Sequence, residues 1–507
     1  MVALGWPAFR HLTEAGKRIY WFHLTDDEAQ HTELIERLSQ TGQYGEWSGP
    51  PFAPRLTTGP TVVLPASLLQ RSLHLASAHA GRIVVLAYHF LLLALLISIA
   101  RTWLAPRPFT RAGTVVIALA GAGIFHSVYG GLSETGYYLF GVLGEGAAAF
   151  FLIATLFSFS RSMFFLAGVA ASLAVFSKPY MLTLLPALIL AKFIQNFRTP
   201  KISVLSQIFS VLFGIAVPFL AWIWWQMMVM GFEPTLAWWR AYPQTMRETN
   251  GAGFPAQFSF SFLGLGMIEA WLEHCRGLLT IMKAKSVLAW MIGIGFIVSG
   301  ALRFYKRSGF MIVAACFALA HGAWWFTLSP GAQARYFFPL AVLGWTGFTI
   351  AVLRFGKWSL SRLTGGHQAR WVHGFQPHFG FTALVAIVMV GSFSWDIAET
   401  WKANRGRFDR CELCRQLVIQ DFYRSVAPAK RPSVIFTTST KADKELFLSA
   451  PYRYQAFDPL SPVRMPSGSW VSVGDFARPG ATEFVREHCK KIFTPPARLE
   501  GFWNCSY

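Results

Sequence analysis

The acidic residues of this chain gather in one short stretch near its beginning. Asp26, Asp27 and Glu28 are consecutive, and five carboxylates fall within residues 26–36 although the whole chain has only 25 acidic residues. A carboxylate that is partly removed from water has a raised pKa and can act as a general base. A structural role is also open, because Thr25 and Glu28 have the spacing of a helix capping box. Composition alone favours the capping role. Whether these carboxylates also act in catalysis must be judged from the rest of the sequence.

Those surroundings are apolar and basic. Hydrophobic residues make up 53% of the chain and charged residues 14%, whereas soluble domains average roughly 25% charged residues. The net charge is +20, but Lys and Arg fall in short clusters between apolar runs, which favours a membrane protein over a nucleic-acid binder. Residues 1–25 show no secretory signal peptide. The composition therefore indicates an all-α polytopic membrane protein.

Apolar runs of about 20 residues, enough to cross a bilayer, recur through residues 82–395. They predict about ten transmembrane helices, starting near residues 82, 113, 136, 162, 179, 203, 286, 309, 335 and 378. The runs between residues 162 and 195 are short and are separated by Ser177-Lys178-Pro179. Before the first span, residues 49–69 contain five prolines. They predict an irregular and stiff loop.

The basic clusters predict the orientation, because cytoplasmic loops carry an excess of Lys and Arg. Every inner loop is basic if residues 26–81 lie outside. Three outer elements result: residues 26–81, the loop 231–285 and the tail 396–507. The loop is rich in Trp and Phe, so we expect it to lie along the membrane interface.

The tail is predicted to be a small extracytoplasmic α/β domain. Strand-like segments at 433–438 and 470–473 alternate with helix-like segments near 441–449 and 481–492. Four of the six cysteines lie in the tail: Cys411, Cys414, Cys489 and Cys505. A zinc site is one interpretation, but no histidine accompanies them at ligand spacing. An oxidising compartment favours disulfides, with three possible connectivities.

Several short motifs follow the acidic stretch on the predicted outer side. They are Asp27-Glu28-Ala29, Gly42–Tyr44, Glu134 at an outer helix end, Ser177-Lys178-Pro179, and A-R-Y-F-F-P-L at 334–340. In order and location this set resembles the GT-C glycosyltransferases of the protein-mannosyltransferase and aminoarabinose-transferase type. Those proteins are polytopic membrane enzymes that use polyprenyl-phosphate-linked sugars. The resemblance covers roughly residues 20–395 and leaves out the tail.

The resemblance implies a catalytic role for the acidic stretch. Asp27 would be the general base that deprotonates an acceptor hydroxyl, so that the sugar is transferred with inversion. Glu28 would orient the acceptor or serve a metal, although its capping role is equally open. Asp26 stays outside the matching pair and is a weaker competitor.

The leaving group in such a reaction is a lipid phosphate, which needs cations where its charge develops. Arg335, Tyr336 and Lys178 are the candidates for donor phosphate binding. Each also has an ordinary interpretation, because Arg and Lys snorkel and Tyr belongs to the aromatic belt at a membrane interface.

Four further polar residues are weighed in the same way. Glu134 lies at an outer helix end, and Arg240 is a candidate for binding anionic lipid. Glu145 lies deeper in its span, where ionisable groups are usually functional, or it pairs with a polar group of a neighbouring span. We expect His126 to be a hydrogen-bonded core histidine.

The expected partners are a polyprenyl-phosphate-linked sugar donor, membrane lipids, and a glycan, lipid or protein acceptor, with no nucleic acid. A divalent cation, Mg or Mn, is possible as a cofactor. A bacterial inner membrane is the expected location.

GT-C enzymes begin with a transmembrane helix, and residues 1–25 hold no such span. The sequence thus predicts a missing first helix or a truncated start. The competing hypotheses are a lipid or sugar transporter or flippase, which would show inverted repeats, and a non-catalytic scaffold.

Overall fold

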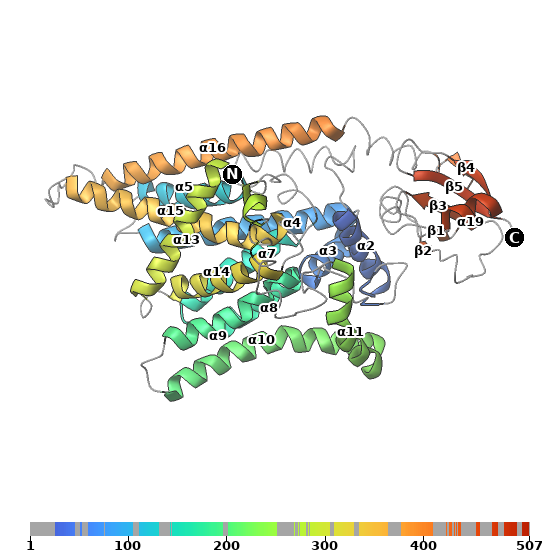
Figure 1. Ribbon diagram of the computed structural model, residues 1–507, viewed down its shortest axis with the longest axis horizontal. Helices are drawn as coiled ribbons and strands as arrows, with labels where there is room; N and C mark the ends of the chain where they lie inside the picture. The colour runs from blue at the N-terminus through green and yellow to red at the C-terminus, as the bar shows by residue number, and fades with distance from the viewer. Residues whose placement is uncertain are drawn as a thin grey trace.

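Long apolar helices make up most of the computed structural model (Figure 1). The structure describes residues 26–45, 51–52, 59–75, 77–104, 111–130, 142, 144–195, 201–250, 268, 272, 274–279, 282, 284–304, 309–328, 334–363, 377–408, 422, 425–427, 430, 432, 434–437, 453–456, 469–474, 481–493 and 499–505. The bundle helices are α4 (Ser77–Leu104), α5 (Arg111–Gly130), α7 (Glu145–Ser160), α8 (Phe164–Ser177), α9 (Leu184–Gln195), α10 (Lys201–Met230), α13 (Ala284–Phe304), α14 (Gly309–Leu328), α15 (Ala334–Leu363) and α16 (Pro377–Phe408). Each predicted span corresponds to one of these helices.

Apolar content and length decide which helices can cross a bilayer. Within the described residues, four helices are long and apolar enough to do so: His79–Arg101, Val204–Met230, Ser286–Arg303 and Gly309–Phe326. The other bundle helices carry shorter apolar stretches. The predicted all-α membrane fold is therefore confirmed, although several spans are shorter than their sequence pattern suggests.

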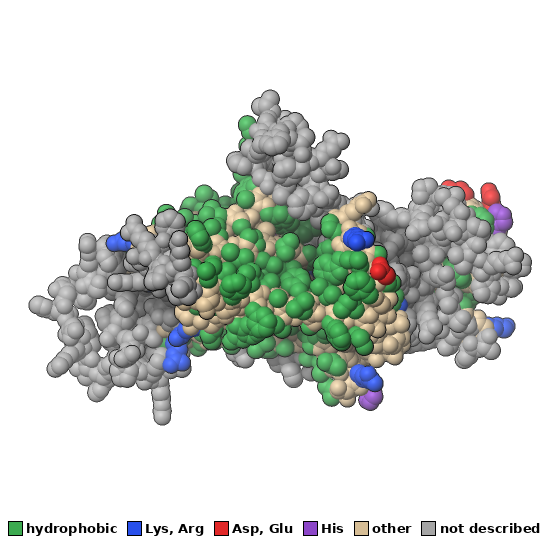
Figure 2. Space-filling model, turned by 90° about the horizontal axis from the view of Figure 1, so that it is seen from below, with side chains coloured by type: hydrophobic (Ala, Val, Ile, Leu, Met, Phe, Trp, Pro, Cys, Tyr) green, Lys and Arg blue, Asp and Glu red, His purple; other side chains and the backbone are tan. Residues whose placement is uncertain are grey.

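The outer surface of the bundle suits a lipid environment. Large apolar side chains of α10 are exposed: Phe209, Phe213, Leu220, Trp224 and Met228. Figure 2 shows a face on which apolar side chains cover the middle, while the visible Lys and Arg side chains lie toward the two ends. An apolar band between charged ends matches a hydrocarbon layer between two aqueous surfaces. The chain is an integral multi-pass membrane protein.

The proline-rich segment before the first span is partly helical, which corrects the prediction of an irregular loop. Helix α3 (Pro60–Leu73) lies within it. Pro60 occupies the first turn, where its missing N–H costs nothing. Pro65 removes one helical hydrogen bond and so frees the carbonyl of Thr61. The Tyr88 hydroxyl of α4 donates to that carbonyl at 2.7 Å, and this tertiary contact offsets the loss.

Helix α2 (Asp26–Thr41) precedes α3 and starts where the acidic stretch predicts a helix start. It ends at Gly42, whose φ of +71° is left-handed and whose N–H donates to the Leu38 carbonyl at 3.0 Å. Glycine adopts this conformation without a steric penalty. Tyr44 then packs against Trp222 and Trp225 near the end of α10. The Gly42–Tyr44 motif therefore ends the helix and anchors it.

The long loop that the sequence predicts to lie outside, residues 231–285, begins with helix α11 (Phe232–Asn250). Its Trp238 stacks on Tyr242, with ring centroids 4.8 Å apart, and donates its indole N–H to the Phe52 carbonyl. The first part of the loop therefore packs back onto the segment that follows α2. Residues of this loop beyond α11 are mostly outside the described residues.

The tail contains a small mixed sheet with the order β2-β1-β3-β5-β4. The strands are β1 (Val434–Thr437), β2 (Arg453–Ala456), β3 (Ser469–Gly474), β4 (Cys489–Phe493) and β5 (Leu499–Cys505), and helix α19 (Ala481–His488) precedes β4. β1 is parallel to both β2 and β3, whereas β5 is antiparallel to β3 and β4. The two predicted strands and the small α/β tail are confirmed.

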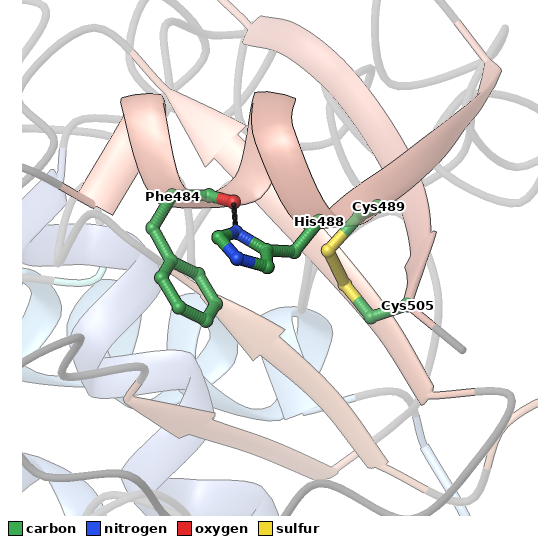
Figure 3. Close-up of a disulfide and its surroundings, with 4 residues drawn as sticks. All are labelled: Phe484, His488, Cys489 and Cys505. Atoms are coloured by element: carbon green, nitrogen blue, oxygen red, sulfur yellow. Dashed lines mark hydrogen bonds between the residues drawn. A yellow bond between two sulfur atoms is a disulfide. The ribbon is translucent and has the colours of Figure 1, made fainter. Parts of the chain in front are cut away.

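Two tail predictions have other outcomes. The helix expected over 481–492 ends at His488 and continues as β4, because those residues pair with β5. Cys489 and Cys505 are opposite each other in that pairing and form a disulfide (Figure 3). The disulfide interpretation is thus confirmed for this pair. Cys411, Cys414 and the helix expected near 441–449 lie outside the described residues.

Candidate functional site

Most of the predicted site residues that the structure describes lie at helix ends on one side of the bundle, whereas Arg240 lies in the middle of α11. Figure 1 places α2, α3 and α11 together at the end of the bundle that faces the tail sheet. The beginnings of α4, α7 and α15 and the end of α8 all belong to this side by the alternation of the chain. This is the side that the basic clusters predict to be the outer one.

The acidic stretch forms the first turn of α2. Asp26, Asp27 and Glu28 begin that helix, and their side chains lie outside the described residues. His31 follows Asp27 by one helical turn, is buried, and donates from Nδ1 to the carbonyl oxygen of Val142. This bond fixes the first half of α2 against the segment that leads into α7.

A buried ion pair lies just beyond Val142. The Nζ atom of Lys178 is 3.1 Å from Oε1 of Glu145, and the two side chains are 6% and 1% exposed. Glu145 is the first residue of α7, and Lys178 separates α8 from the short 3₁₀ helix η1 (Pro179–Thr183). The pairing that was one of the two interpretations of Glu145 is confirmed.

Proline explains why the helix breaks at this lysine. A residue before proline is pushed out of the helical region, and Lys178 has extended backbone angles of φ −150° and ψ 124°. Pro179 then opens η1 at a position that needs no N–H donor. The Ser177-Lys178-Pro179 motif thus places a charged residue at a helix end inside the bundle.

Two glycines let the backbone approach this ion pair. A Cβ atom on Gly144 would lie 2.3 Å from the Ser177 carbonyl oxygen and 3.0 Å from Cε of Lys178. A Cβ atom on Gly146 would lie 2.6 Å from the His89 ring. A side chain at position 144 would therefore displace the Ser177 backbone or Lys178, and one at position 146 would displace His89. Small residues allow the same close approach between membrane helices in general.

Helix α3 reaches the same place. Thr61 Oγ1 and Ser177 Oγ are hydrogen-bonded at 2.8 Å, and a Cβ atom on Gly59 would collide with the Phe176 backbone. The segment between α2 and α4 therefore packs directly on the residues that precede Lys178. Sequence reasoning missed Thr61, and the only signal for it was its position beside Gly59-Pro60.

An aromatic group lies on the other side of the helix break. Tyr180 and Tyr336 meet edge to face with ring centroids 5.6 Å apart, and Trp324 packs against both. His321 Nε2 donates to the Tyr336 carbonyl at 2.9 Å, and its Nδ1 is 2.9 Å from Thr183 Oγ1. Two phosphate candidates therefore border η1, because Lys178 precedes it and Tyr336 contacts its Tyr180.

The remaining candidates are less well placed. Arg335 lies in the first turn of α15 beside Tyr336, but its side chain is outside the described residues. Glu134 also lies outside the described residues, and Arg240 is exposed on α11. Within the described part of the chain, no three His, Cys, Asp or Glu side chains gather to hold a metal ion. His126 is a hydrogen-bonded core residue as expected, 3.0 Å from Ser394 Oγ.

Comparison with known proteins defines the fold class. No protein-family model matches the chain, and neither does any curated protein. The chain nevertheless shares its fold with a solved membrane protein. The structure is similar to that of ArnT from Cupriavidus metallidurans, a GT-C aminoarabinose transferase solved in complex with undecaprenyl phosphate. The TM-score is 0.57 at 11% identity, over 95% of this chain and 94% of ArnT.

This likeness confirms the GT-C fold that the motifs predicted. It also extends further than the motif resemblance, because a match over 95% of the chain reaches into the tail. At 11% identity the comparison establishes the arrangement of the helices, and the chemistry of the site must be argued from the residues themselves.

Proposed function

We propose that this chain is a membrane glycosyltransferase that moves a sugar from a polyprenyl-phosphate-linked donor to an acceptor hydroxyl. One observation carries the proposal. Within a GT-C fold, an acidic helix start, a buried lysine and a tyrosine pair occupy the same end of the bundle. The similar fold of ArnT, which was solved with undecaprenyl phosphate bound, supports a lipid phosphate as the donor carrier.

Asp27 is the proposed general base. Its carboxylate accepts the proton of the acceptor hydroxyl while the acceptor oxygen forms a bond to the anomeric carbon. The bond from that carbon to the phosphate oxygen breaks, and the polyprenyl phosphate leaves with the electron pair. Attack from the face opposite the phosphate inverts the anomeric configuration. The buried hydrogen bond of His31 supports this role, because it fixes the turn next to Asp27.

Arg335, Tyr336 and Lys178 are proposed to stabilise the charge that develops on the departing phosphate. A guanidinium binds phosphate oxygens through two donors at once, and a tyrosine hydroxyl or an ammonium adds one donor each. Glu28 is proposed to orient the acceptor or to hold a divalent cation such as Mg or Mn. No step of the reaction described above depends on a metal.

The proposed location is a bacterial inner membrane, with the site and the tail on the extracytoplasmic side. The Cys489–Cys505 disulfide supports this orientation of the tail, because disulfides persist in oxidising compartments. Glycan, lipid and protein acceptors all present hydroxyl groups that such a site would accept.

Replacement of the proposed base provides the direct test. We expect Asp27→Asn to lower sugar transfer from a polyprenyl-phosphate-linked donor by about a hundredfold or more, the usual range for a lost general base. Asp26→Asn and Glu28→Gln in the same assay distinguish the three neighbouring carboxylates.

We expect Arg335→Ala to weaken binding of the donor instead, which is measured as a raised KM for the polyprenyl-phosphate-linked sugar.

Glu399→Gln is a matched control, because Glu399 is exposed on α16 and loses the same charge. It should keep the parent rate. Transfer at the parent rate by Asp27→Asn would reject Asp27 as the base, and the same result for Glu28→Gln would leave neither residue of the pair as the base.

A further inference from the structure

Lys178 and Glu145 form an ion pair that is almost completely enclosed, with both side chains buried. Removing two charges from water is unfavourable, and many buried pairs would be no less stable as apolar residues. The pair therefore needs an explanation beyond the stability of the fold. Ionisable side chains at membrane depth usually take part in function.

The ion pair leaves part of the hydrogen-bonding capacity of both side chains unused within the described residues. Oε1 of Glu145 contacts Lys178, but the buried Oε2 has no hydrogen-bond partner among the residues that the structure describes. The Lys178 ammonium has three N–H donors, and its only contact in the described part of the chain is that with Glu145. Both partners thus keep hydrogen-bonding capacity that the described part of the bundle does not use.

The surroundings fix the lysine from one side. Gly144 lies against Cε of Lys178, and the Thr61–Ser177 hydrogen bond anchors the residue before it. The Tyr180–Tyr336 pair occupies the other side of the helix break. A long flexible side chain is therefore held in one orientation by a carboxylate and by close backbone contacts.

We propose that Glu145 is a positioning residue for the lipid phosphate: it fixes the Lys178 ammonium so that the remaining N–H groups bind the phosphate oxygens. The inference rests on the proposed function, and it adds Glu145 to the donor site. A fixed ammonium binds an anion better than a mobile one, because less side-chain entropy is lost on binding. Glu145 acts through Lys178 and touches neither the sugar nor the phosphate.

A double-mutant cycle separates this role from a purely structural one. The probe is undecaprenyl phosphate, with undecaprenol as the matched lipid that lacks the phosphate, and binding to the purified full chain in detergent is measured. We expect Glu145→Gln to weaken binding of the phosphate about tenfold in the parent background. In the Lys178→Met background the same change should alter binding less than about twofold, and binding of undecaprenol should not change in any variant.

Two conservative variants keep the test decisive if a charge removal unfolds the protein. Lys178→Arg should retain binding of undecaprenyl phosphate within a few-fold, because it keeps the charge and the pair, and Glu145→Asp should have an intermediate effect. Lys192→Met is the control, because Lys192 is a buried lysine on α9 away from the site. It should leave the affinity for undecaprenyl phosphate unchanged.

Equal losses from Glu145→Gln in both backgrounds would overturn the proposal, because Glu145 would then act independently of Lys178. Unchanged affinity in folded Glu145→Gln protein would also overturn it. Failure of the proposed function looks different: the parent chain itself would bind undecaprenyl phosphate no better than undecaprenol, before any variant is compared.

Discussion

Tyr44, which follows α2, and Tyr242, which lies on α11, both have raised phenol pKa values. Burial raises the pKa of Tyr242 to about 12, and burial together with the neighbouring Tyr242 raises the pKa of Tyr44 above its ordinary value. A phenol with a raised pKa stays neutral in the folded chain at a pH where it ionises in the unfolded chain. The fold is then destabilised as the pH rises.

The sign of the effect gives a prediction for Tyr242. Its contribution to stability is complete below pH 10, where the phenol is neutral in both states, and it is lost between pH 10 and pH 12. We expect the thermal unfolding temperature of the detergent-solubilised protein to fall over this interval. Tyr242→Phe should show a smaller fall, because the ring stays on Trp238 while the ionisable hydroxyl is absent. Parallel curves for the two proteins would contradict the assignment.

Single residues differ in how well their surroundings can be predicted from the sequence. The helix break at Lys178 is predictable, because the following proline acts on its immediate neighbour. The partner of Lys178 is less so, since Glu145 is distant in the chain and its pairing depends on how α7 packs against α8. The hydrogen bond of His31 with Val142 has no local signal, and that of Thr61 with Ser177 has only the neighbouring Gly59-Pro60.

At the scale of elements, α3 shows how a tertiary contact overrides local propensity. Five prolines between residues 49 and 69 predict a loop, yet the second half of that segment is helical. Tyr88 replaces the hydrogen bond that Pro65 removes, and it comes from another helix. The strand β4 is a similar case, since pairing with β5 and the Cys489–Cys505 disulfide determine its conformation.

A second double-mutant cycle, with Tyr88 and Pro65, tests the hydrogen bond between α4 and α3. We expect Tyr88→Phe to destabilise the protein by about 1–3 kcal/mol, because it leaves the Thr61 carbonyl without a donor. Pro65→Ala restores the backbone N–H that can bond this carbonyl within the helix. Tyr88→Phe should therefore cost clearly less in the Pro65→Ala background, as measured by thermal unfolding in detergent. The same cost in both backgrounds would show that the hydroxyl stabilises something else.

At the scale of the whole molecule, composition was a sufficient guide to the membrane helices. Apolar runs and basic clusters are summed over many residues, so errors at single positions average out. Each predicted span therefore corresponds to a helix of the structure. The first outer segment could not be placed in this way. Its position depends on particular contacts, such as that of Gly59 with the backbone of Phe176. The acidic turn is predictable as a helix start, whereas its neighbours in space are not.

The shortness of α8 has a consequence for the bilayer itself. Phe164–Ser177 is bounded by a turn at Arg161–Met163 and by the break at Lys178. Its 14 residues span ~21 Å, about 9 Å less than a typical hydrocarbon core. Phe165 and Leu166 of this helix are exposed. Hydrophobic mismatch of this kind is relieved by local thinning of the lipid, which would bring the headgroup layer down toward Lys178.

Lipid thickness should therefore affect this protein directly. We expect a higher unfolding temperature in nanodiscs of short-chain phospholipids than in nanodiscs of long-chain ones, with the same headgroup throughout. Equal unfolding temperatures across the series would exclude a mismatch at α8. Under the proposed function, a membrane that is thin at this one helix would let the phosphate of the lipid donor approach Lys178 while the donor stays in its own leaflet.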